Sequence, residues 1–429
     1  MTLEAAVFAR VRLRLIPFMF LLYVVNYLDR VNIGFAALQM NKDLGFGPEV
    51  YGYGAGIFFW GYLLFEVPSN LLMDQVEARI WIARIMVGWG IVSTSMMFIH
   101  SATAFFALRF LLGIAEAGFF PGMILYLTYW FPASERAKAV AQFMTATAIA
   151  GVIGGPLSGA LLTLNGTLGL RGWQWLFMLE GIPSILLGVV VFIYLTDRPE
   201  QAYWLTEEQR TWLVGRMEAD RASRADTGHT SVTAALTNGR VWLFAMLYFC
   251  IVVCFYGVTF FLPTILKQLS GLPDFAIGLI AAIPYFIAAV TMVLVGMSSD
   301  RTGERHLHLA ASVTVGAIGL VLSSLTTQPV LALIALSIAA AGIWGGLGPF
   351  WAMPTAYLSG TAAAGGIALI NSVGNLGGFL GPSLVGGIVQ RTGNFSLALF
   401  TIAGSLVIAC VLVLVLRAVS AAPPPRHAA

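Results

Sequence analysis

The chain has 429 residues, of which 59% are hydrophobic and only 10% are charged. A soluble domain carries about 25% charged residues, so this composition cannot cover a water-exposed surface and excludes a soluble globular protein. The formal net charge of +3 is too small to indicate a nucleic-acid partner.

Apolar segments of roughly 20 residues follow one another through the chain, and this is the length that an α-helix needs to cross a bilayer. Lipid offers no partners to backbone polar groups, so such segments must be helical. Arg10, Arg12 and Arg14 lead directly into the first segment, without the short apolar stretch and cleavage site of a signal peptide. We expect an all-α membrane protein with twelve transmembrane helices, at 15–38, 50–73, 81–100, 104–130, 137–163, 173–195, 241–266, 275–298, 307–327, 330–354, 362–389 and 395–416.

The distribution of Lys and Arg predicts the orientation in the membrane. With the N-terminus in the cytoplasm, seventeen of these residues fall on the cytoplasmic side and four in outer loops. This bias indicates that both termini are cytoplasmic, in a multi-pass protein of a bacterial-type inner (plasma) membrane. The long loop 197–240 contains Thr206-Glu-Glu-Gln209, a capping-box pattern that predicts a short surface helix. The tail 421–429 is predicted to be disordered.

Two motifs recur in the chain at one common offset. The pairs are Asn70-xxx-Asp74-xxxx-Arg79 with Gly296-xxx-Asp300-Arg301-x-Gly303-x-Arg305, and Gly151-xxx-Gly155-Pro156 with Gly377-xxx-Gly381-Pro382. The members of both pairs are 226 residues apart (296 − 70 and 377 − 151). Transporters are often built from such repeated halves. We therefore predict two pseudo-symmetric six-helix bundles, at 1–196 and 241–420, joined by the cytoplasmic loop.

Four ionisable residues stand well inside predicted membrane helices: Asp29, Arg30, Arg109 and Glu116. Each costs about 2.5–3.5 kcal/mol at the bilayer centre, so such residues usually serve function. Arg30 and Arg109 suit a carboxylate, which a guanidinium binds in a bidentate manner. Asp29 and Glu116 would then carry protons. The alternative is two neutralising ion pairs, Asp29 with Arg30 and Arg109 with Glu116, that only hold helices together.

Weaker polar candidates could bind substrate or could simply join and pack helices. Asn371 and Asn375 are one turn apart and share a helix face. The candidates are Tyr27, Tyr62, Thr147, Trp351, Asn371 and Asn375. Glu66 and Glu180 lie toward predicted helix ends, where a structural role is at least as well supported as a functional one.

No catalytic constellation or metal-ligand pattern is apparent, and the chain lacks the GxxxxGK[ST] loop of ATP-driven machinery. We therefore expect a non-enzymatic protein with no cofactor, protons being the coupling ion. Its expected partners are a small organic anion and the lipid bilayer, and we expect it to function as a monomer.

The loop Gly296-Met-Ser-Ser-Asp300-Arg301-Thr-Gly303-Glu-Arg305 resembles the loop signature of the major facilitator superfamily. More narrowly, the chain resembles the anion:cation symporter family, in its branch of tartrate-, phthalate- and sugar-acid-type permeases. The matching stretches span nearly the whole chain: Asn26-Tyr-Leu-Asp-Arg-Val-Asn-Ile-Gly-Phe-Ala36, Phe65-Glu-Val-Pro-Ser-Asn70, Gly172-Trp-Gln-Trp-Leu-Phe177, Asp197-Arg-Pro-Glu200 and Asn371-Ser-Val-Gly-Asn375.

The resemblance implies that the four intramembrane charges bind substrate and protons. It also implies that two loops gate the conformational change, through Asp74, Arg79, Asp300, Arg301 and Arg305. The first of these loops departs from the family, because Gln75 and Glu77 stand where a basic residue and a glycine are usual. This departure bears on the balance between conformations and not on transport itself.

These features together predict proton-coupled import, by alternating access, of a hydroxy-dicarboxylate such as tartrate, a sugar acid or an aromatic carboxylate. An exchanger or exporter is the alternative, because Gly151-xxx-Gly155-Pro156-xx-Gly159 resembles a motif of drug antiporters. A membrane receptor or channel is the alternative outside transport. The chain shows no appended sensor domain, and acids paired with arginines inside the membrane argue against a simple pore.

Overall fold

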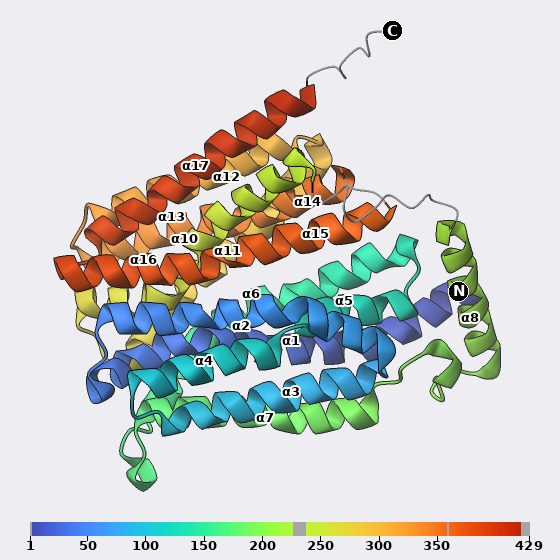
Figure 1. Cartoon of the computed structure of the whole chain (residues 1–429), viewed down its shortest axis with the longest axis horizontal. Helices are drawn as coiled ribbons and strands as arrows, with labels where there is room; N and C mark the ends of the chain where they lie inside the picture. The colour runs from blue at the N-terminus through green and yellow to red at the C-terminus, as the bar shows by residue number, and fades with distance from the viewer. Residues whose placement is uncertain (1, 226–236, 358–359, 422–429) are drawn as a thin grey trace. The chain divides into compact units, whose positions relative to one another are not determined.

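The computed structural model describes residues 2–225, 237–357 and 360–421, and every regular element in these ranges is a helix (Figure 1). The predicted disordered tail lies almost wholly outside the described residues, as does the middle of the loop 197–240. The α-helices are α1 (Leu3–Leu44), α2 (Pro48–Gln75), α3 (Ala78–Ser95), α4 (Ala102–Glu116), α5 (Phe119–Trp130), α6 (Ala133–Leu162), α7 (Gly172–Tyr194), α8 (Glu207–Ala225), α10 (Gly239–Ser270), α11 (Asp274–Thr302), α12 (Arg305–Ser324), α13 (Pro329–Gly345), α14 (Leu347–Tyr357), α15 (Gly360–Asn375), α16 (Gly377–Thr392) and α17 (Ser396–Ala421).

Each predicted membrane span coincides with one helix or with two consecutive helices separated by a short break. The broken spans are α4–α5, α13–α14 and α15–α16. In the described part of the chain, eleven segments are long and apolar enough to cross a membrane. They do not include α1, whose Asn26, Asp29, Arg30 and Asn32 lower its mean hydropathy. With α1 the structure contains the twelve predicted spans.

The chain divides into two compact units. Unit 1 comprises Met1–Gly228, Leu262–Lys267 and Gly271–Ala282, and unit 2 comprises the rest. The start of α11 is tied into unit 1 by Asp274, which accepts a hydrogen bond from Gln39 Nε2 at 2.8 Å and pairs with Lys267 at 2.9 Å.

Helix boundaries repeat at the offset that the motifs predict. α1 and α10 end 226 residues apart (270 − 44), and α2 and α11 begin 226 residues apart (274 − 48). The paired glycine motifs also act alike. Gly155 of α6 packs against the backbone of Gly278, and Gly381 of α16 packs against the backbone of Val253. A Cβ at either position would overlap main chain, so each motif permits a close helix contact.

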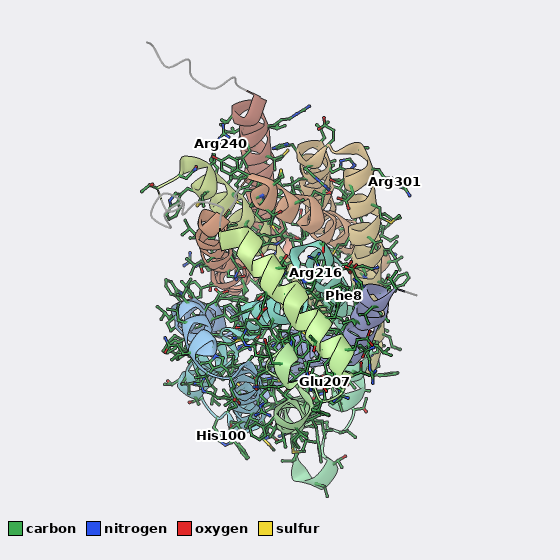
Figure 2. The ribbon with its side chains drawn as sticks, turned by 90° about the vertical axis from the view of Figure 1, so that its right-hand side faces the viewer. Phe8, His100, Glu207, Arg216, Arg240 and Arg301 are labelled. Carbon is green, nitrogen blue, oxygen red and sulfur yellow. The ribbon has the colours of Figure 1, made fainter. Side chains whose placement is uncertain are left out.

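The capping box predicted at Thr206 is present. The Thr206 hydroxyl accepts from the Gln209 amide at 3.3 Å, and Gln209 Oε1 accepts from the Thr206 amide at 3.3 Å. α8 therefore begins at Glu207, as Figure 2 shows, and passes close to Phe8. The Phe8 and Trp212 rings meet edge to face with centroids 5.6 Å apart. Arg10 Nη1 also donates to Gln209 Oε1 at 3.2 Å, so α8 is anchored on the first turns of α1.

Candidate functional site

Glu116 owes its position to the break between α4 and α5. α4 ends at Glu116, and Gly118 then takes φ +87°, a left-handed conformation that residues with a Cβ rarely adopt. The carboxyl thus stands at a helix terminus inside the membrane span, where it is only 1% exposed. The sequence places Glu116 within one continuous helix, and the break is what the structure adds.

The partner of Glu116 is Arg30. Arg30 Nη2 of α1 forms an ion pair with Glu116 Oε1, and the Arg30 side chain is 14% exposed. Its guanidinium lies 5.6 Å from the Phe58 ring centroid and 5.5 Å from that of Tyr62, both on α2. Aromatic rings attract a cation through their faces. Three helices therefore hold one guanidinium that retains some access to solvent.

Arg109 lies deeper and is held by backbone. It is 1% exposed, its Nη2 donates to the Ala55 carbonyl at 3.0 Å, and its Nε donates to the Gly54 carbonyl at 3.4 Å. The Phe58 ring centroid is 5.2 Å from its guanidinium. In this arrangement Arg109 fixes α4 to α2. Its predicted contact with substrate would require those carbonyl contacts to open.

Two glycines bring α2 and α4 close enough for these contacts. A Cβ on Gly113 of α4 would overlap the backbone at Phe58 and Tyr62, and a Cβ on Gly61 of α2 would overlap the backbone at Phe110. The close approach places Phe58 and Tyr62 beside the arginines. The aromatic wall of the site therefore depends on two positions that carry no side chain.

We expect Gly113→Ala to lower the midpoint of thermal unfolding by several degrees, because overpacking typically costs about 1–3 kcal/mol. Gly88→Ala on α3 is the matched control, since a Cβ there meets no atom within 4 Å. The measurement is thermal unfolding of the purified protein in detergent. Equal midpoints for the two variants would show that the α2–α4 contact is not tight.

Asp29 points away from Arg30 and toward α3 and α7. Its carboxylate accepts from Trp89 Nε1 (2.8 Å), Ser93 Oγ (2.8 Å), Ser184 Oγ (2.9 Å) and Asn32 Nδ2 (3.4 Å). The alternative drawn from sequence, with Asp29 paired to Arg30 and Arg109 to Glu116, is therefore not the arrangement found. Asp29 accepts hydrogen bonds from neutral donors, and Arg30 pairs with Glu116. Trp89, Ser93 and Ser184 went unnoticed in the sequence because no motif marks them.

Other candidates of unit 1 differ in their surroundings. Tyr27 is buried. Thr147 is half-buried, and its hydroxyl donates to the Met144 carbonyl of its own helix at 2.8 Å.

Asn26 was not singled out from the sequence. It lies one turn before Arg30, is fully buried, and its side-chain amide makes no hydrogen bond to a described residue. It is an additional candidate for contact with substrate.

Unit 2 contributes a separate group of polar and aromatic side chains. Asn371 and Asn375 are half-buried on α15, and Asn375 is the last residue before the break at Leu376. The half-buried Trp351 of α14 lies edge-on to Tyr248, with ring centroids 5.0 Å apart, and Gly374 packs directly against Tyr248. Tyr248 therefore joins the candidates of unit 2.

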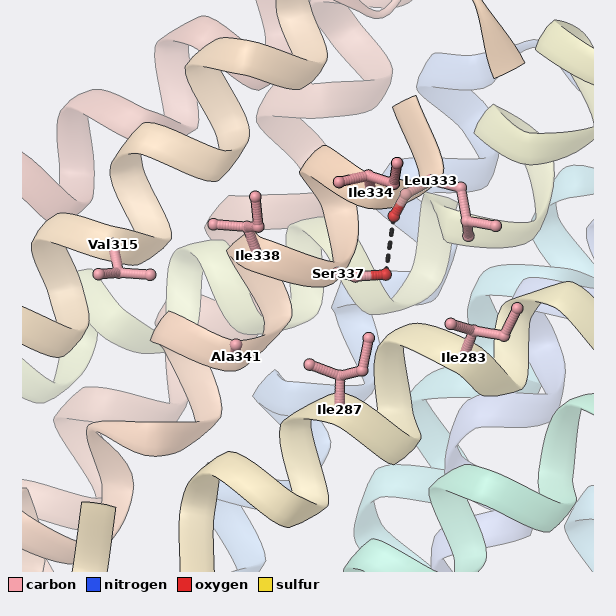
Figure 3. A pocket seen from close by; sticks show the side chains of 8 residues that line it. All are labelled: Ile283, Ile287, Val315, Leu333, Ile334, Ser337, Ile338 and Ala341. Carbon is pink, nitrogen blue, oxygen red and sulfur yellow. Dashed lines mark hydrogen bonds between the residues drawn. The ribbon is translucent and has the colours of Figure 1, made fainter. Parts of the chain in front are cut away.

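An apolar groove in unit 2 does not suit an anion (Figure 3). It encloses about 310 Å³. Its one hydroxyl, on Ser337, donates to the Leu333 carbonyl at 2.7 Å. The remaining lining residues carry no polar side chain: Ile283, Ile287, Val315, Leu333, Ile334, Ile338 and Ala341. Within the described ranges, no three His, Cys, Asp or Glu side chains are grouped so as to hold a metal ion.

The second gating loop is stabilised by an ion pair between its own residues. Arg305 forms an ion pair with Asp300 and donates to Ser299 Oγ at 3.2 Å, whereas Arg301 is exposed. Gly303 turns the chain between α11 and α12 with φ +73°. This conformation explains why the loop needs glycine at that position.

The first gating loop is built differently. Glu77, the counterpart of Gly303, has φ −57°, and Arg79 pairs with Asp197 Oδ2 beyond α7 at 2.9 Å. Partial burial raises the pKa of Asp197, which nevertheless accepts from the Arg79 amide at 2.8 Å. The Asp74 side chain lies outside the described part of the structure. The loop that carries the unusual Glu77 therefore has its arginine, Arg79, paired with Asp197 outside the loop.

A model of the family described as the Major Facilitator Superfamily matches residues 19–382. The chain belongs to the major facilitator superfamily. It is accordingly a multi-pass membrane transporter and not an enzyme, and the fold predicted from the sequence is confirmed.

Relatives extend over nearly the whole chain. A protein of Agrobacterium vitis named "Putative tartrate transporter" is 52% identical over 414 residues, which cover 96% of this chain and 92% of the relative. A "Quinolone resistance transporter" of Acinetobacter baumannii is 42% identical, with coverage of 93% and 92%. The solved structure of a bacterial homologue of the human lysosomal transporter Spinster has a TM-score of 0.77, covering 97% of this chain and 99% of that one. At 19% identity it shares the fold.

Proposed function

We propose that this transporter imports a small organic anion together with protons across a bacterial inner membrane. The observation that carries the proposal is the ion pair of Arg30 with Glu116, in which a partly accessible guanidinium is held by a buried acid. A guanidinium inside a membrane span is rare and suits carboxylate recognition. Both units belong to one chain, so a monomer would suffice.

The pair links proton binding to anion binding. An ionised Glu116 occupies Arg30, so the substrate carboxylate must compete with it. Protonation of Glu116 removes that competitor and leaves Arg30 free to bind the carboxylate. By linkage, a bound anion favours protonation of Glu116 to the same extent. Because both ligands favour each other, they would move in the same direction, which is symport.

Tartrate and related hydroxy acids are the substrates best supported. Their carboxylate matches Arg30, while their hydroxyls require hydrogen-bonding groups of the kind that Tyr62 provides beside that guanidinium. The Agrobacterium vitis relative, named for tartrate, supports this class. We take L-tartrate as the test substrate.

We expect proteoliposomes with an alkaline interior to accumulate radiolabelled L-tartrate at least about tenfold, since one coupled proton allows a tenfold ratio for one pH unit. An ionophore that collapses the pH gradient and the membrane potential should abolish accumulation. Replacing sodium by potassium on both sides should leave it unchanged. Sodium-dependent uptake without a pH gradient would instead assign the coupling to sodium.

Drug export is the second candidate, because the Acinetobacter baumannii relative is named for quinolone resistance. Inverted vesicles supplied with an external fluorescent quinolone distinguish the two functions, because an exporter carries the drug into their lumen. Proton-driven quinolone movement with no response to tartrate would favour export.

A further inference from the structure

Glu180 is a buried acid that takes no part in the Arg30–Glu116 pair. It lies in the third turn of α7 and is 5% exposed. Its Oε1 accepts from Ser158 Oγ of α6 at 2.9 Å, while its buried Oε2 makes no hydrogen bond to a described residue. The sequence places Glu180 toward a helix end, where a structural role is at least as well supported as a functional one. The structure instead places it inside the helix packing of unit 1, near Asp29.

Asp29 and Glu180 have contrasting surroundings. An ionised carboxylate can accept about four hydrogen bonds, and Asp29 receives four, from Trp89, Ser93, Ser184 and Asn32. Fewer donors surround Glu180, namely Ser158 and Asn32, the second of which also donates to Asp29. A buried charge with so few donors is costly. Asp29 and Glu180 are thus two buried acids that share Asn32, and one proton held by the pair avoids burying two charges together.

Asp29 lies next to Glu180, because Ser184, one turn along α7 from Glu180, donates to Asp29 Oδ2 at 2.9 Å. On α3, the nearest charged residue along the helix is Arg84, and Gly90 packs beside Gly181 six residues farther on, about 9 Å along the axis. On α6, the charged residues lie in the first two turns, about 30 Å from Ser158. Asp29 in turn faces Glu116 across α1. No arginine therefore offsets the charge of Glu180, and one proton is needed to keep the two acids buried together.

We propose that Glu180 binds and releases a second proton in each transport cycle, at a buried site that it shares with Asp29. This inference rests on the proton-coupled function proposed above. Asp29 and Arg30 are consecutive on α1 and point about 100° apart around it, one toward the Glu180 site and the other toward Glu116. A shift of α1 that follows anion binding at Arg30 would therefore also alter the donors around Asp29. Release is a simple dissociation, in which the Glu180 O–H bond breaks, its electron pair stays on the oxygen and the proton passes to water.

The competing interpretation is a permanently neutral Glu180 that only joins α7 to α6 through Ser158. The number of coupled protons separates the two. With the membrane potential clamped at zero and one pH unit across the vesicle, two protons per anion allow L-tartrate to accumulate about a hundredfold, and one proton allows about tenfold.

We expect the wild-type limit to be about a hundredfold and that of Glu180→Gln to be about tenfold. In this variant position 180 can no longer release a proton, so Glu116 is the coupled proton site that remains. A wild-type limit near tenfold, or an unchanged limit in Glu180→Gln, would overturn the inference and leave proton-coupled transport standing. No accumulation by the wild-type protein would instead contradict the proposed function itself.

If Glu180→Gln does not fold, Ser158→Ala tests whether Glu180 binds and releases a proton. Removing the Ser158 donor to Glu180 should shift the pH of half-maximal L-tartrate uptake, a property that a merely structural acid would not affect. The matched control is Ser95→Ala, whose hydroxyl donates to the Ile91 carbonyl of its own helix. An unchanged pH profile in Ser158→Ala would overturn the inference.

Discussion

Glu116→Gln should lower the concentrative uptake of L-tartrate about tenfold while sparing exchange. The amide keeps the size of the acid and mimics its protonated form permanently, so Arg30 stays free for the anion. For one pH unit across the membrane, the accumulation ratio in proteoliposomes should fall by a factor of about ten, because the proton of the pair can no longer be released. Counterflow of labelled against unlabelled L-tartrate should persist, and the pH dependence that Glu116 gives to L-tartrate affinity should disappear.

A purely structural ion pair predicts a different result for the same variant. Loss of one partner would leave a buried cation unpaired, and such a change typically destabilises by about 3–5 kcal/mol. Thermal unfolding measured alongside transport distinguishes the two. The matched control is Glu49→Gln in the first turn of α2, where the side chain is exposed. Accumulation with a normal pH dependence would remove Glu116 from the coupling mechanism.

Arg30→Ala should abolish L-tartrate binding without preventing membrane insertion. Even Arg30→Lys should weaken binding by about ten- to a hundredfold, because an ammonium cannot reproduce the two parallel hydrogen bonds of a guanidinium. One lost hydrogen bond to a charged group is worth about 1.5–3 kcal/mol, and each 1.4 kcal/mol is a factor of ten. Equilibrium binding of labelled L-tartrate to the purified protein measures the effect.

Arg84→Lys is the control, because Arg84 is exposed and lies over the Trp81 ring at 4.2 Å. Arg109→Lys provides a second comparison. Since the Arg109 guanidinium donates to the carbonyls of Gly54 and Ala55, the lysine variant should lose thermal stability as well as any affinity that Arg109 supplies. Near-native affinity in Arg30→Lys would contradict bidentate recognition of the carboxylate.

The sequence by itself determined the features that depend on short stretches of chain. Apolar segment length predicted the twelve spans, because one segment must satisfy its own backbone across the bilayer. The Thr206–Gln209 pattern predicted where α8 begins, since both partners of a capping box lie within one turn. The common offset of two motifs predicted the repeat that the helix boundaries show.

Only the tertiary structure decided which charges meet. Asp29 and Arg30 are neighbours in sequence, yet consecutive residues point about 100° apart around a helix, and the helices packed on each side supplied different partners. Arg109 and Glu116 share a face of α4. Because α2 approaches closely and α4 ends just before Gly118, Arg109 donates to backbone carbonyls of α2 whereas Glu116 pairs with Arg30. The partners of Glu180 likewise come from other helices, since Ser158 belongs to α6. A helical pattern gives the direction of a side chain from its own axis, whereas its partner is set by contacts between segments far apart in the chain.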